Sequence, residues 1–284
     1  MALGHLCSKI RVYLRICMLN ENNVQDYLAI VSVMQPEVSL TFIKHLQNTH
    51  LSTFPFSNLG VLLHENRSLE SQILLDRVVR NRRGGYCFEH NKIFFEILSF
   101  LGFHCEIVLG RVLHGRDIDV PRTHRITRIA LAGNHYIVDV GFGPLCPREP
   151  LLVDLDKPQD QGDAVYRIIQ PDQGRYLLQL HKIDGWLTLY SFDNGFYTEA
   201  DCLCGHHYSS THPDAVFVNN LVVSRKSYDN VQFLRNSEFH RIRGEKRVIT
   251  KILSQEHLGI ILWQEFGLKV NGDQLVTLYE GYCK

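Results

Sequence analysis

The sequence predicts an α+β protein in which a helical unit, a β unit and an α/β unit follow one another. In the first third of the chain, apolar residues recur at i, i+3, i+4 and i+7, the spacing of one face of a helix. Across residues 105–208, short runs rich in β-branched and aromatic residues are separated by Gly, Asn, Asp or Pro, a pattern typical of an antiparallel sheet or a small barrel. The last part of the chain mixes both patterns. We therefore expect units at residues 18–102, 103–208 and 209–284.

Capping residues and apolar spacing predict the helices of the first unit. Asn22 or Asn23 is expected to cap a helix at residues 24–33, and Ser39 is expected to cap a second one. Residues 69–80 are predicted to form a further helix.

The strands expected in the β unit are short. They comprise residues 105–112, 126–131, 136–140, 166–169, 176–181 and 186–191. In the third unit we expect strands at residues 217–225 and 247–253, followed by a helix at residues 255–266.

Composition and charge exclude several classes of protein. The 284 residues include 30 Lys or Arg and 30 Asp or Glu, so the formal net charge is zero, and 45% of residues are hydrophobic. A general nucleic-acid binder or a polybasic membrane-surface protein would carry a basic excess. No run of 18 apolar residues occurs, so we expect no transmembrane helix. The chain is long enough for a sizeable buried core.

The first 17 residues are expected to be an extension ahead of a second possible start at Met18, and whether the working protein includes them is left open at this point. They carry Lys9, Arg11 and Arg15 and no acidic residue, as transit peptides do. These charges interrupt the apolar runs, and the helical pattern begins only after Met18. The eight cysteines are irregularly spaced in a long chain without a secretory signal, so we expect reduced thiols and a cytoplasmic protein.

Cys87 is the candidate nucleophile. It follows Gly84 and Gly85 and begins a predicted helix that Gly102 is placed to end. Amides at a helix N-terminus favour the thiolate, and the glycines permit the close backbone approach that an oxyanion site needs. The alternative is a small buried apolar side chain, the commoner role of a lone cysteine.

His124 and Asp139 are the candidate partners of Cys87. A turn at Ala132-Gly133 joins two predicted strands and places residue 124 opposite residue 141. Asp139 then lies on the same face as His124, one diagonal away at about 7–8 Å between backbones, a gap that the two side chains can close. A carboxylate that orients the imidazole completes a Cys–His–Asp triad. The alternative is a strand histidine that is simply satisfied by a neighbour.

Five segments resemble motifs of the arylamine N-acetyltransferase family. They are RGGYCFEHN at residues 83–91, THRI at 123–126, DVGFG at 139–143, PFSNL at 55–59 and STHP at 210–213. The first is similar to the family's RGGxCFExN, and the fourth is similar to an element usually written PFENL. The order of the segments and the gaps of 37 and 15 residues between the triad candidates also fit. The resemblance spans about residues 18–284.

The resemblance implies a cysteine-protease-like fold of helical bundle, β-barrel and α/β lid, and a ping-pong acyl transfer. Cys87 would attack the acetyl thioester of acetyl-CoA and hold the acetyl group, while its backbone N–H helps to hold the oxyanion. His124 would pair with the thiolate and then assist proton transfer, and Asp139 would orient His124. The acceptor would be an arylamine, arylhydrazine or arylhydroxylamine.

The resemblance also implies residues around the triad. Phe56, Phe142 and Phe217 match family positions that wall the acceptor pocket, and Thr123 and Gly143 match positions near the pantetheine of coenzyme A. Simple core packing is the alternative for each phenylalanine.

Two segments depart from the family pattern. Ser57 stands where the PFENL element has Glu, and residues 202–207, CLCGHH, replace a stretch that usually lacks cysteines. Zinc is the alternative use of such a cluster, but the spacing differs from that of usual zinc sites, so we expect no metal. His207 would lie beside the lid, where it could alter the acceptor or coenzyme A site.

Other functions remain open at this point. A related amide synthase of natural-product biosynthesis and a transglutaminase-like cysteine hydrolase use the same triad, because one fold supports several chemistries. A non-catalytic binding protein would be expected to lack a triad member, and none is missing here. We expect small-molecule substrates, without nucleic-acid or membrane partners.

Overall fold

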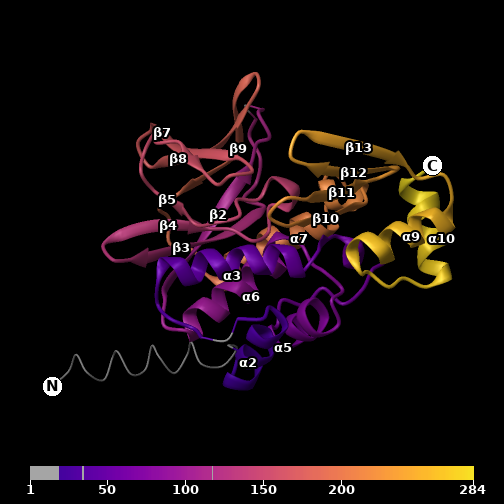
Figure 1. The fold of residues 1–284 in the computed structure, drawn as a ribbon, viewed down its shortest axis with the longest axis horizontal. Coiled ribbons are helices and arrows are strands. Elements are labelled where there is room, and N and C mark those ends of the chain that lie inside the picture. Colours follow the sequence, from indigo (N-terminus) through magenta and orange to yellow (C-terminus); the bar gives the residue numbers. More distant parts are fainter. Residues whose placement is uncertain (1–18, 34, 117) are drawn as a thin grey trace.

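The computed structural model describes residues 19–33, 35–116 and 118–284, so the predicted extension at residues 1–17 lies outside the described residues. Helices come first along the chain and form one layer beneath two sheets (Figure 1). These first helices are α2 (Glu21–Ile30), α3 (Leu40–Thr53), α4 (Leu59–Leu62), α5 (Ser71–Leu74), the π-helical η1 (Leu75–Arg80) and α6 (Cys87–Phe100). The predicted α+β class is confirmed.

The caps of the first two helices test the sequence reasoning. Ser39 caps α3 through a bond from the Phe42 amide, as predicted. The cap predicted for α2 is wrong, because the N-cap is Asn20 rather than Asn22 or Asn23. The Asn20 side chain accepts from the Asn23 amide and the Asn23 side chain accepts from the Asn20 amide, and this reciprocal capping box starts the helix earlier.

Two further predictions concern helix ends. The helix predicted for residues 69–80 begins at Ser71, because the Glu70 side chain accepts from the Gln72 amide, and it widens into a π-helix from Leu75. Helix α6 begins at Cys87 as predicted. It ends before Gly102, whose φ of 93° is a backbone conformation that glycine adopts without strain.

The β unit is a nearly closed antiparallel barrel. Its eight strands run in the order β5-β4-β3-β2-β9-β8-β7-β6. They are β2 (His104–Val112), β3 (His124–Leu131), β4 (Asn134–Val138), β5 (Leu151–Leu152), β6 (Gln159–Asp160), β7 (Val165–Asp172), β8 (Arg175–Lys182) and β9 (Gly185–Asp193). All six predicted strands are present, with small shifts at their ends. The short 3-10 helix η2 (Gly143–Leu145) follows β4.

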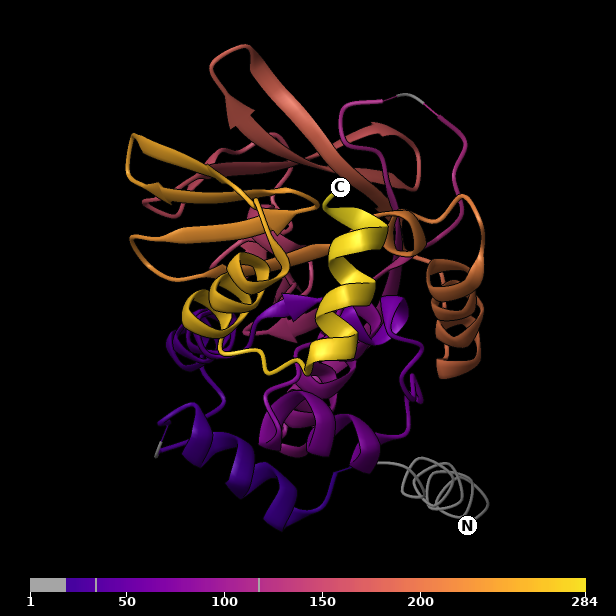
Figure 2. The ribbon, with the colours of Figure 1, turned by 90° about the vertical axis from the view of Figure 1, so that its right-hand side faces the viewer.

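The C-terminal region is a second antiparallel sheet with helices beside it (Figure 2). Its order is β1-β10-β11-β12-β13, so β1 (Phe56–Ser57) from the helical unit forms one edge. The other strands are β10 (Val222–Lys226), β11 (Val231–Arg235), β12 (Glu238–Arg243) and β13 (Lys246–Lys251), and the helices are α9 (Gln255–Phe266) and α10 (Gly272–Tyr282). The prediction of α9 is confirmed at both ends.

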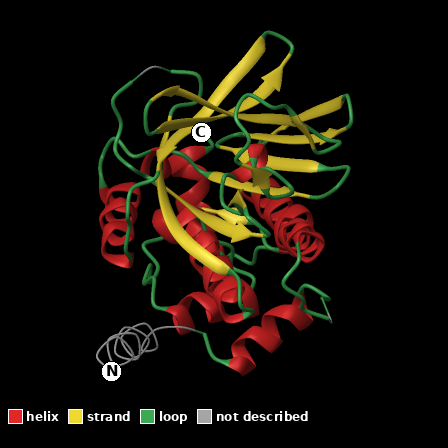
Figure 3. Cartoon of the chain, turned by 90° about the vertical axis from the view of Figure 1, so that its left-hand side faces the viewer, coloured by secondary structure: helices red, strands yellow, loops and turns green. Residues whose placement is uncertain are grey.

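Sequence patterns missed or misassigned several elements of this region, among them strands β11 and β12, which were not predicted. The strand predicted at residues 217–225 is wrong in its first half, because α8 (Val216–Asn219) is helical and the strand begins only at Val222. Helices α7 (Glu199–Thr211) and α10 were not predicted. Helix α7 lies at the side of the molecule (Figure 3), and its weak amphipathic pattern explains why periodicity did not reveal it.

Three clusters of buried side chains make up the core. One packs the N-terminal helices against the barrel and includes Cys87, a second fills the barrel, and a third lies between the C-terminal sheet and α9 and α10. None of the described helices is long and apolar enough to cross a membrane.

Candidate active site

Cys87 is the first residue of α6, and the double glycine that precedes it lies against the short strand β1. The Ser57 amide donates to the Gly85 carbonyl at 2.6 Å, and Phe56 forms a β-bridge with Gly85. Gly84 has a φ of 73°, and a Cβ there would lie 2.7 Å from the carbonyl oxygen of Pro55, so this turn requires glycine. The double glycine thus brings the backbone close to β1 and sets the start of α6.

His124 and Asp139 meet as the predicted register requires. Thr127 pairs with Val138 in the β3–β4 ladder, and continuing that register places residue 124 opposite residue 141. His124 Nε2 lies 2.7 Å from Asp139 Oδ2, and both side chains are buried. Because the carboxylate can only accept, Nε2 carries the proton of this bond and Nδ1 is left for another partner.

The Asp139 carboxylate is held by three further donors. Asn91 Nδ2 and the Gly141 amide donate to Oδ1 at 3.0 and 2.8 Å, and the Tyr190 hydroxyl donates to Oδ2 at 3.3 Å. Burial alone would raise the pKa of Asp139, but His124, Asn91 and Gly141 together hold that pKa below its usual value. Asp139 is therefore an anion in a buried site.

Sequence reasoning missed the part that Asn91 takes in this site. Its Nδ2 also donates to the Arg125 carbonyl at 2.6 Å, and its Oδ1 accepts from the Val140 amide at 2.9 Å. One amide thus ties α6 to both strands of the His–Asp pair. The signal was present in the sequence, because Asn91 follows Cys87 by four residues and so lies on the same helix face.

Cys87 is packed between the two segments that carry His124 and Asp139. Its Sγ donates to the Thr123 carbonyl at 3.4 Å. A Cβ on Gly141 would lie 2.7 Å from Cys87 Cα, so the backbone after Asp139 is in close contact with the start of α6. The structure therefore brings together the three residues predicted from spacing.

The Cys87 thiol has a raised pKa, whereas its place at a helix N-terminus was expected to favour the thiolate. Cys87 is 3% exposed, and burial raises the pKa of its thiol, as does the negative charge of Asp139. Burial outweighs the bonds from backbone amides because a thiolate loses its water there. Burial by itself therefore favours the neutral thiol of Cys87 over the thiolate.

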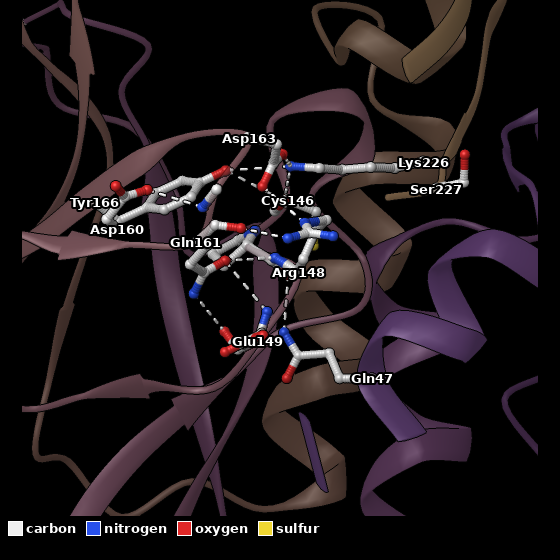
Figure 4. A network of polar contacts seen from close by, with 12 residues as sticks. Gln47, Cys146, Arg148, Glu149, Asp160, Gln161, Asp163, Tyr166, Lys226 and Ser227 are labelled. Atoms are coloured by element: carbon white, nitrogen blue, oxygen red, sulfur yellow. Dashed lines mark hydrogen bonds and ion pairs between the residues drawn. The ribbon is translucent and has the colours of Figure 1, made fainter. Parts of the chain in front are cut away.

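A polar network anchors the loop that follows Asp139. Gln47 of α3 donates to the Asp139 carbonyl at 3.1 Å. Asp163 pairs with Arg148 and with Lys226, each at 2.7 Å (Figure 4). Arg148 and Lys226 are buried, and Lys226 lies on β10. The network therefore ties this loop to the helical layer and to the C-terminal sheet.

Aromatic rings lie around the Cys–His–Asp group in two sets. Phe142 packs against His124, with ring centroids 4.9 Å apart, and against Tyr190 at 5.0 Å. Phe56 and Phe217 contact each other at 5.7 Å. All three phenylalanines predicted for the acceptor pocket pack against the core cluster that contains Cys87.

The two residues predicted near the pantetheine lie in the segments that carry His124 and Asp139. Thr123 contacts Cys87 through its carbonyl. Gly143 begins η2 with a φ of 67°, and a Cβ on it would lie 3.5 Å from Ser224 Oγ of the C-terminal sheet.

The segment at residues 202–207 forms part of helix α7. Cys202 is buried and Cys204 is exposed, so the two thiols point to different environments. Among the described residues, no group of three or more His, Cys, Asp or Glu is placed to hold a metal ion. His206 rather than His207 reaches the site, where its Nδ1 lies 2.5 Å from the Tyr86 hydroxyl.

Sequence comparison assigns the family. A family model described as N-acetyltransferase matches residues 39–276. The chain is 32% identical over 232 residues to the arylamine N-acetyltransferase / N-hydroxyarylamine O-acetyltransferase of Salmonella typhimurium, which covers 81% of this chain and 82% of that relative. The chain belongs to the arylamine N-acetyltransferase family. The resemblance based on sequence motifs is confirmed, and the chain is an acyltransferase. It is also 31% identical to the arylamine N-acetyltransferase of Escherichia coli, over 82% of this chain and 84% of the relative.

Solved structures of family members share the fold. The structure of the Salmonella typhimurium enzyme matches with a TM-score of 0.87 and 28% identity, covering 92% of this chain and 98% of that chain. The Mycobacterium marinum arylamine N-acetyltransferase in complex with CoA matches with a TM-score of 0.85 and 26% identity, covering 91% of this chain and 99% of the other. The arrangement of bundle, barrel and C-terminal α/β region is thus that of the family.

Proposed function

We propose that this chain transfers an acetyl group from acetyl-CoA to an arylamine, arylhydrazine or arylhydroxylamine by way of a Cys87 thioester. The observation that carries the proposal is the contact of Cys87 with the segments that hold the buried His124–Asp139 pair. Family membership and the CoA complex of a relative support coenzyme A as the donor's carrier.

The first half-reaction acetylates Cys87. The thiol proton moves to His124 Nδ1, and Asp139 stabilises the resulting imidazolium. The thiolate attacks the acetyl carbonyl carbon, and the Cys87 backbone N–H helps to hold the oxyanion. The bond between the acetyl carbon and the coenzyme A sulfur then breaks, and the leaving sulfur takes the proton from His124.

The second half-reaction transfers the acetyl group to the amine. The amine nitrogen attacks the thioester carbon and gives a proton to His124. The bond from that carbon to the Cys87 sulfur then breaks, and the sulfur takes the proton from His124, which restores the thiol and the neutral imidazole. An arylamine suits this step because its nitrogen is neutral at pH 7, whereas an alkylamine must first lose a proton. The raised pKa of the Cys87 thiol supports a mechanism in which the thiolate forms together with the imidazolium.

Phe56, Phe142 and Phe217 are proposed to wall the acceptor pocket, and Thr123 and Gly143 to lie beside the pantetheine. The packing of the three phenylalanines against the cluster that contains Cys87 supports these assignments, as do the ring contacts of Phe56 with Phe217 and of Phe142 with His124.

Intact-protein mass after mixing with acetyl-CoA tests the proposal. We expect one acetyl group on Cys87, which an arylamine such as an aminobenzoate discharges. Cys87→Ser should show no adduct, a transfer rate lower by at least ~10³-fold and an unchanged fold. An adduct that persists with every amine would contradict arylamine transfer, and the absence of any adduct would contradict acetyl-CoA as donor.

A further inference from the structure

Helix α7 packs against residues that flank both Cys87 and His124. A Cβ on Gly205 would lie 2.6 Å from the Phe88 ring and 2.5 Å from the Arg122 carbonyl, so the helix is in close contact with both. At its first turn, Glu199 forms two bonds with the buried Arg125, at 2.7 and 2.9 Å. Phe88 follows Cys87 and Arg125 follows His124. The helix therefore touches the neighbours of two triad residues while supplying no triad residue itself.

His206 makes the most specific of these contacts. Its Nε2 lies 2.8 Å from the Arg67 carbonyl, which can only accept, so Nε2 carries a proton. Burial lowers the pKa of His206 to about 4, so the ring is neutral at physiological pH. Nδ1 is then an acceptor, and the Tyr86 hydroxyl donates to it at 2.5 Å, with the His206 backbone carbonyl as a longer second acceptor at 3.3 Å. Both ring nitrogens are thereby engaged, and the tautomer follows from the contacts.

The Tyr86 ring forms one end of a row of aromatic side chains. Its centroid lies 5.2 Å from that of Phe217, and the Phe217 centroid lies 5.7 Å from that of Phe56. We call Tyr86, Phe217 and Phe56 the aromatic wall. Phe56 and Phe217 are proposed above to wall the acceptor pocket, and Tyr86 directly precedes Cys87. Because the Tyr86 hydroxyl is bonded to His206, the position of the ring depends on α7.

We propose that His206 is a positioning residue that holds Tyr86 in the aromatic wall and thereby sets how tightly the arylamine acceptor binds. The proposal rests on the proposed function and adds to it a residue that does not touch the reacting atoms. Without the bond to His206, the buried Tyr86 ring would be held by packing alone, and the less rigid wall would cost affinity for a flat aromatic acceptor. Acetylation of Cys87 by acetyl-CoA does not use the wall and should stay unchanged.

Amide substitutions at residue 206 separate its two bonds. His206→Gln places an amide near the position of Nε2, where it can donate to the Arg67 carbonyl but cannot accept from Tyr86. His206→Asn places an amide near Nδ1, where its oxygen can accept from Tyr86. Tyr86→Phe removes the hydroxyl and keeps the ring. His207→Gln, on an exposed neighbour in the same helix, is the matched control.

Steady-state and single-turnover kinetics give the first readout. We expect His206→Gln and Tyr86→Phe each to raise KM for the arylamine about five- to tenfold, the size of effect that loss of one buried hydrogen bond produces. Their combination should have no larger effect than Tyr86→Phe alone, because Tyr86→Phe already removes the bond that His206→Gln removes. His206→Asn should restore KM to within about threefold of the wild-type value, and the rate of Cys87 acetylation should stay within about twofold throughout. A wild-type KM in His206→Gln, or an equal loss in both half-reactions, would overturn the proposal.

A second readout does not depend on turnover. With 3-fluorotyrosine in place of tyrosine, the ¹⁹F resonance that disappears in Tyr86→Phe reports on the Tyr86 hydroxyl. We expect this resonance to shift in His206→Gln and to stay in place in His207→Gln. An unmoved resonance would contradict the link between His206 and Tyr86. A wild-type protein that acetyl-CoA does not acetylate would instead contradict the proposed function, so the two failures are distinguishable.

Discussion

At the scale of single residues, the proposed triad of Cys87, His124 and Asp139 is held in place by neighbouring side chains and amides. Asp139 is oriented by Asn91, Tyr190 and the Gly141 amide, and it orients His124 in turn. Each of these bonds acts on a buried carboxylate, where an unmade hydrogen bond costs more than it does in water. Small changes at this point should therefore have large effects on activity.

Asp139→Asn tests the role of the carboxylate in proton transfer. The amide cannot stabilise an imidazolium, and its NH₂ group favours the wrong tautomer of His124, so we expect kcat to fall by about 10³-fold or more. Steady-state kinetics measures the loss, and Asp229→Asn, an exposed aspartate, is the control. Retention of most activity would remove Asp139 from the triad.

Gly141→Ala tests the close contact between the loop after β4 and the start of α6. The added Cβ would lie 2.7 Å from both Cys87 Cα and Asn91 Nδ2, so α6 or the loop after β4 must move. We expect a loss of about 1–3 kcal/mol in the free energy of unfolding together with a large loss of activity. Chemical denaturation measures the first quantity.

Gly272→Ala is the matched control for this substitution, because a Cβ there meets nothing within 4 Å. It should leave both stability and activity close to those of the wild-type protein. An equally stable and fully active Gly141→Ala protein would show that the contact is not needed.

At the scale of elements, a buried network of hydrogen-bonded side chains links three helices below the site. The Tyr27 hydroxyl of α2 donates to His50 Nδ1 of α3 at 2.8 Å, and His50 Nε2 lies 2.9 Å from His90 Nδ1 of α6. His90 Nε2 lies 3.2 Å from the Pro55 carbonyl, which can only accept, so Nε2 carries the proton and Nδ1 accepts from His50. The direction of each hydrogen bond in the network follows from this contact. The network ends at Pro55, beside β1, so it supports the contact between β1 and the start of α6.

The two histidines of this network predict that the protein loses stability in mild acid. Burial lowers the pKa of both histidines, that of His90 to about 4, so between pH 6.5 and 4 the unfolded chain binds protons that the folded chain does not. The free energy of unfolding should therefore fall as the pH falls through this window, by up to about 3 kcal/mol from His90 alone. Denaturation curves at a series of pH values measure the slope.

His90→Gln provides the comparison for this slope, since its amide can still donate to Pro55 but does not titrate. The slope between pH 6.5 and 4 should be smaller in this variant and unchanged in His135→Gln, which alters an exposed histidine. An identical slope in all three proteins would exclude His90 as its source.

At the scale of the whole molecule, segments distant in sequence cross between the three parts of the fold. Strand β1 leaves the helical layer to become an edge of the C-terminal sheet. The Asn58 side chain donates to the carbonyls of Phe217 and Asn220 and accepts from the Val222 amide. Helix α7 ties the barrel to the N-terminal helices through Glu199, which pairs with Arg125 of β3 and Lys92 of α6. These contacts adjoin the candidate site, because Arg125 follows His124 and β1 lies against Gly85.

Glu199→Ala tests how much the ion pair between α7 and β3 contributes to stability. It leaves the fully buried Arg125 guanidinium without its bidentate partner, and an uncompensated buried charge is costly. Because Glu199 is 44% exposed, we expect a moderate loss of about 2 kcal/mol in the free energy of unfolding. Glu106→Ala removes a partner of the less buried Arg128 and should cost less than about 1 kcal/mol. Equal effects of the two substitutions would contradict a special role for the α7 pair.

The sequence by itself determined the α+β class, most element positions, the family and the pairing of His124 with Asp139. These follow from local patterns: apolar periodicity, turn residues, and a tight turn at Ala132-Gly133 that sets the register of the two strands it joins. Ser39 as a cap and the bounds of α9 follow in the same way.

Only the tertiary structure decided what surrounds those residues. The raised pKa of Cys87 comes from its burial by segments distant in sequence, and no local pattern reports burial of that kind. The same holds for Asn91 and Tyr190 as partners of Asp139, and for His206 beside Tyr86 across a separation of 120 residues. Helix α7 has little apolar periodicity because its buried face consists mostly of small and polar residues, while Leu203 is exposed. Such contacts depend on the path of the whole chain, which is why they appear only in the fold.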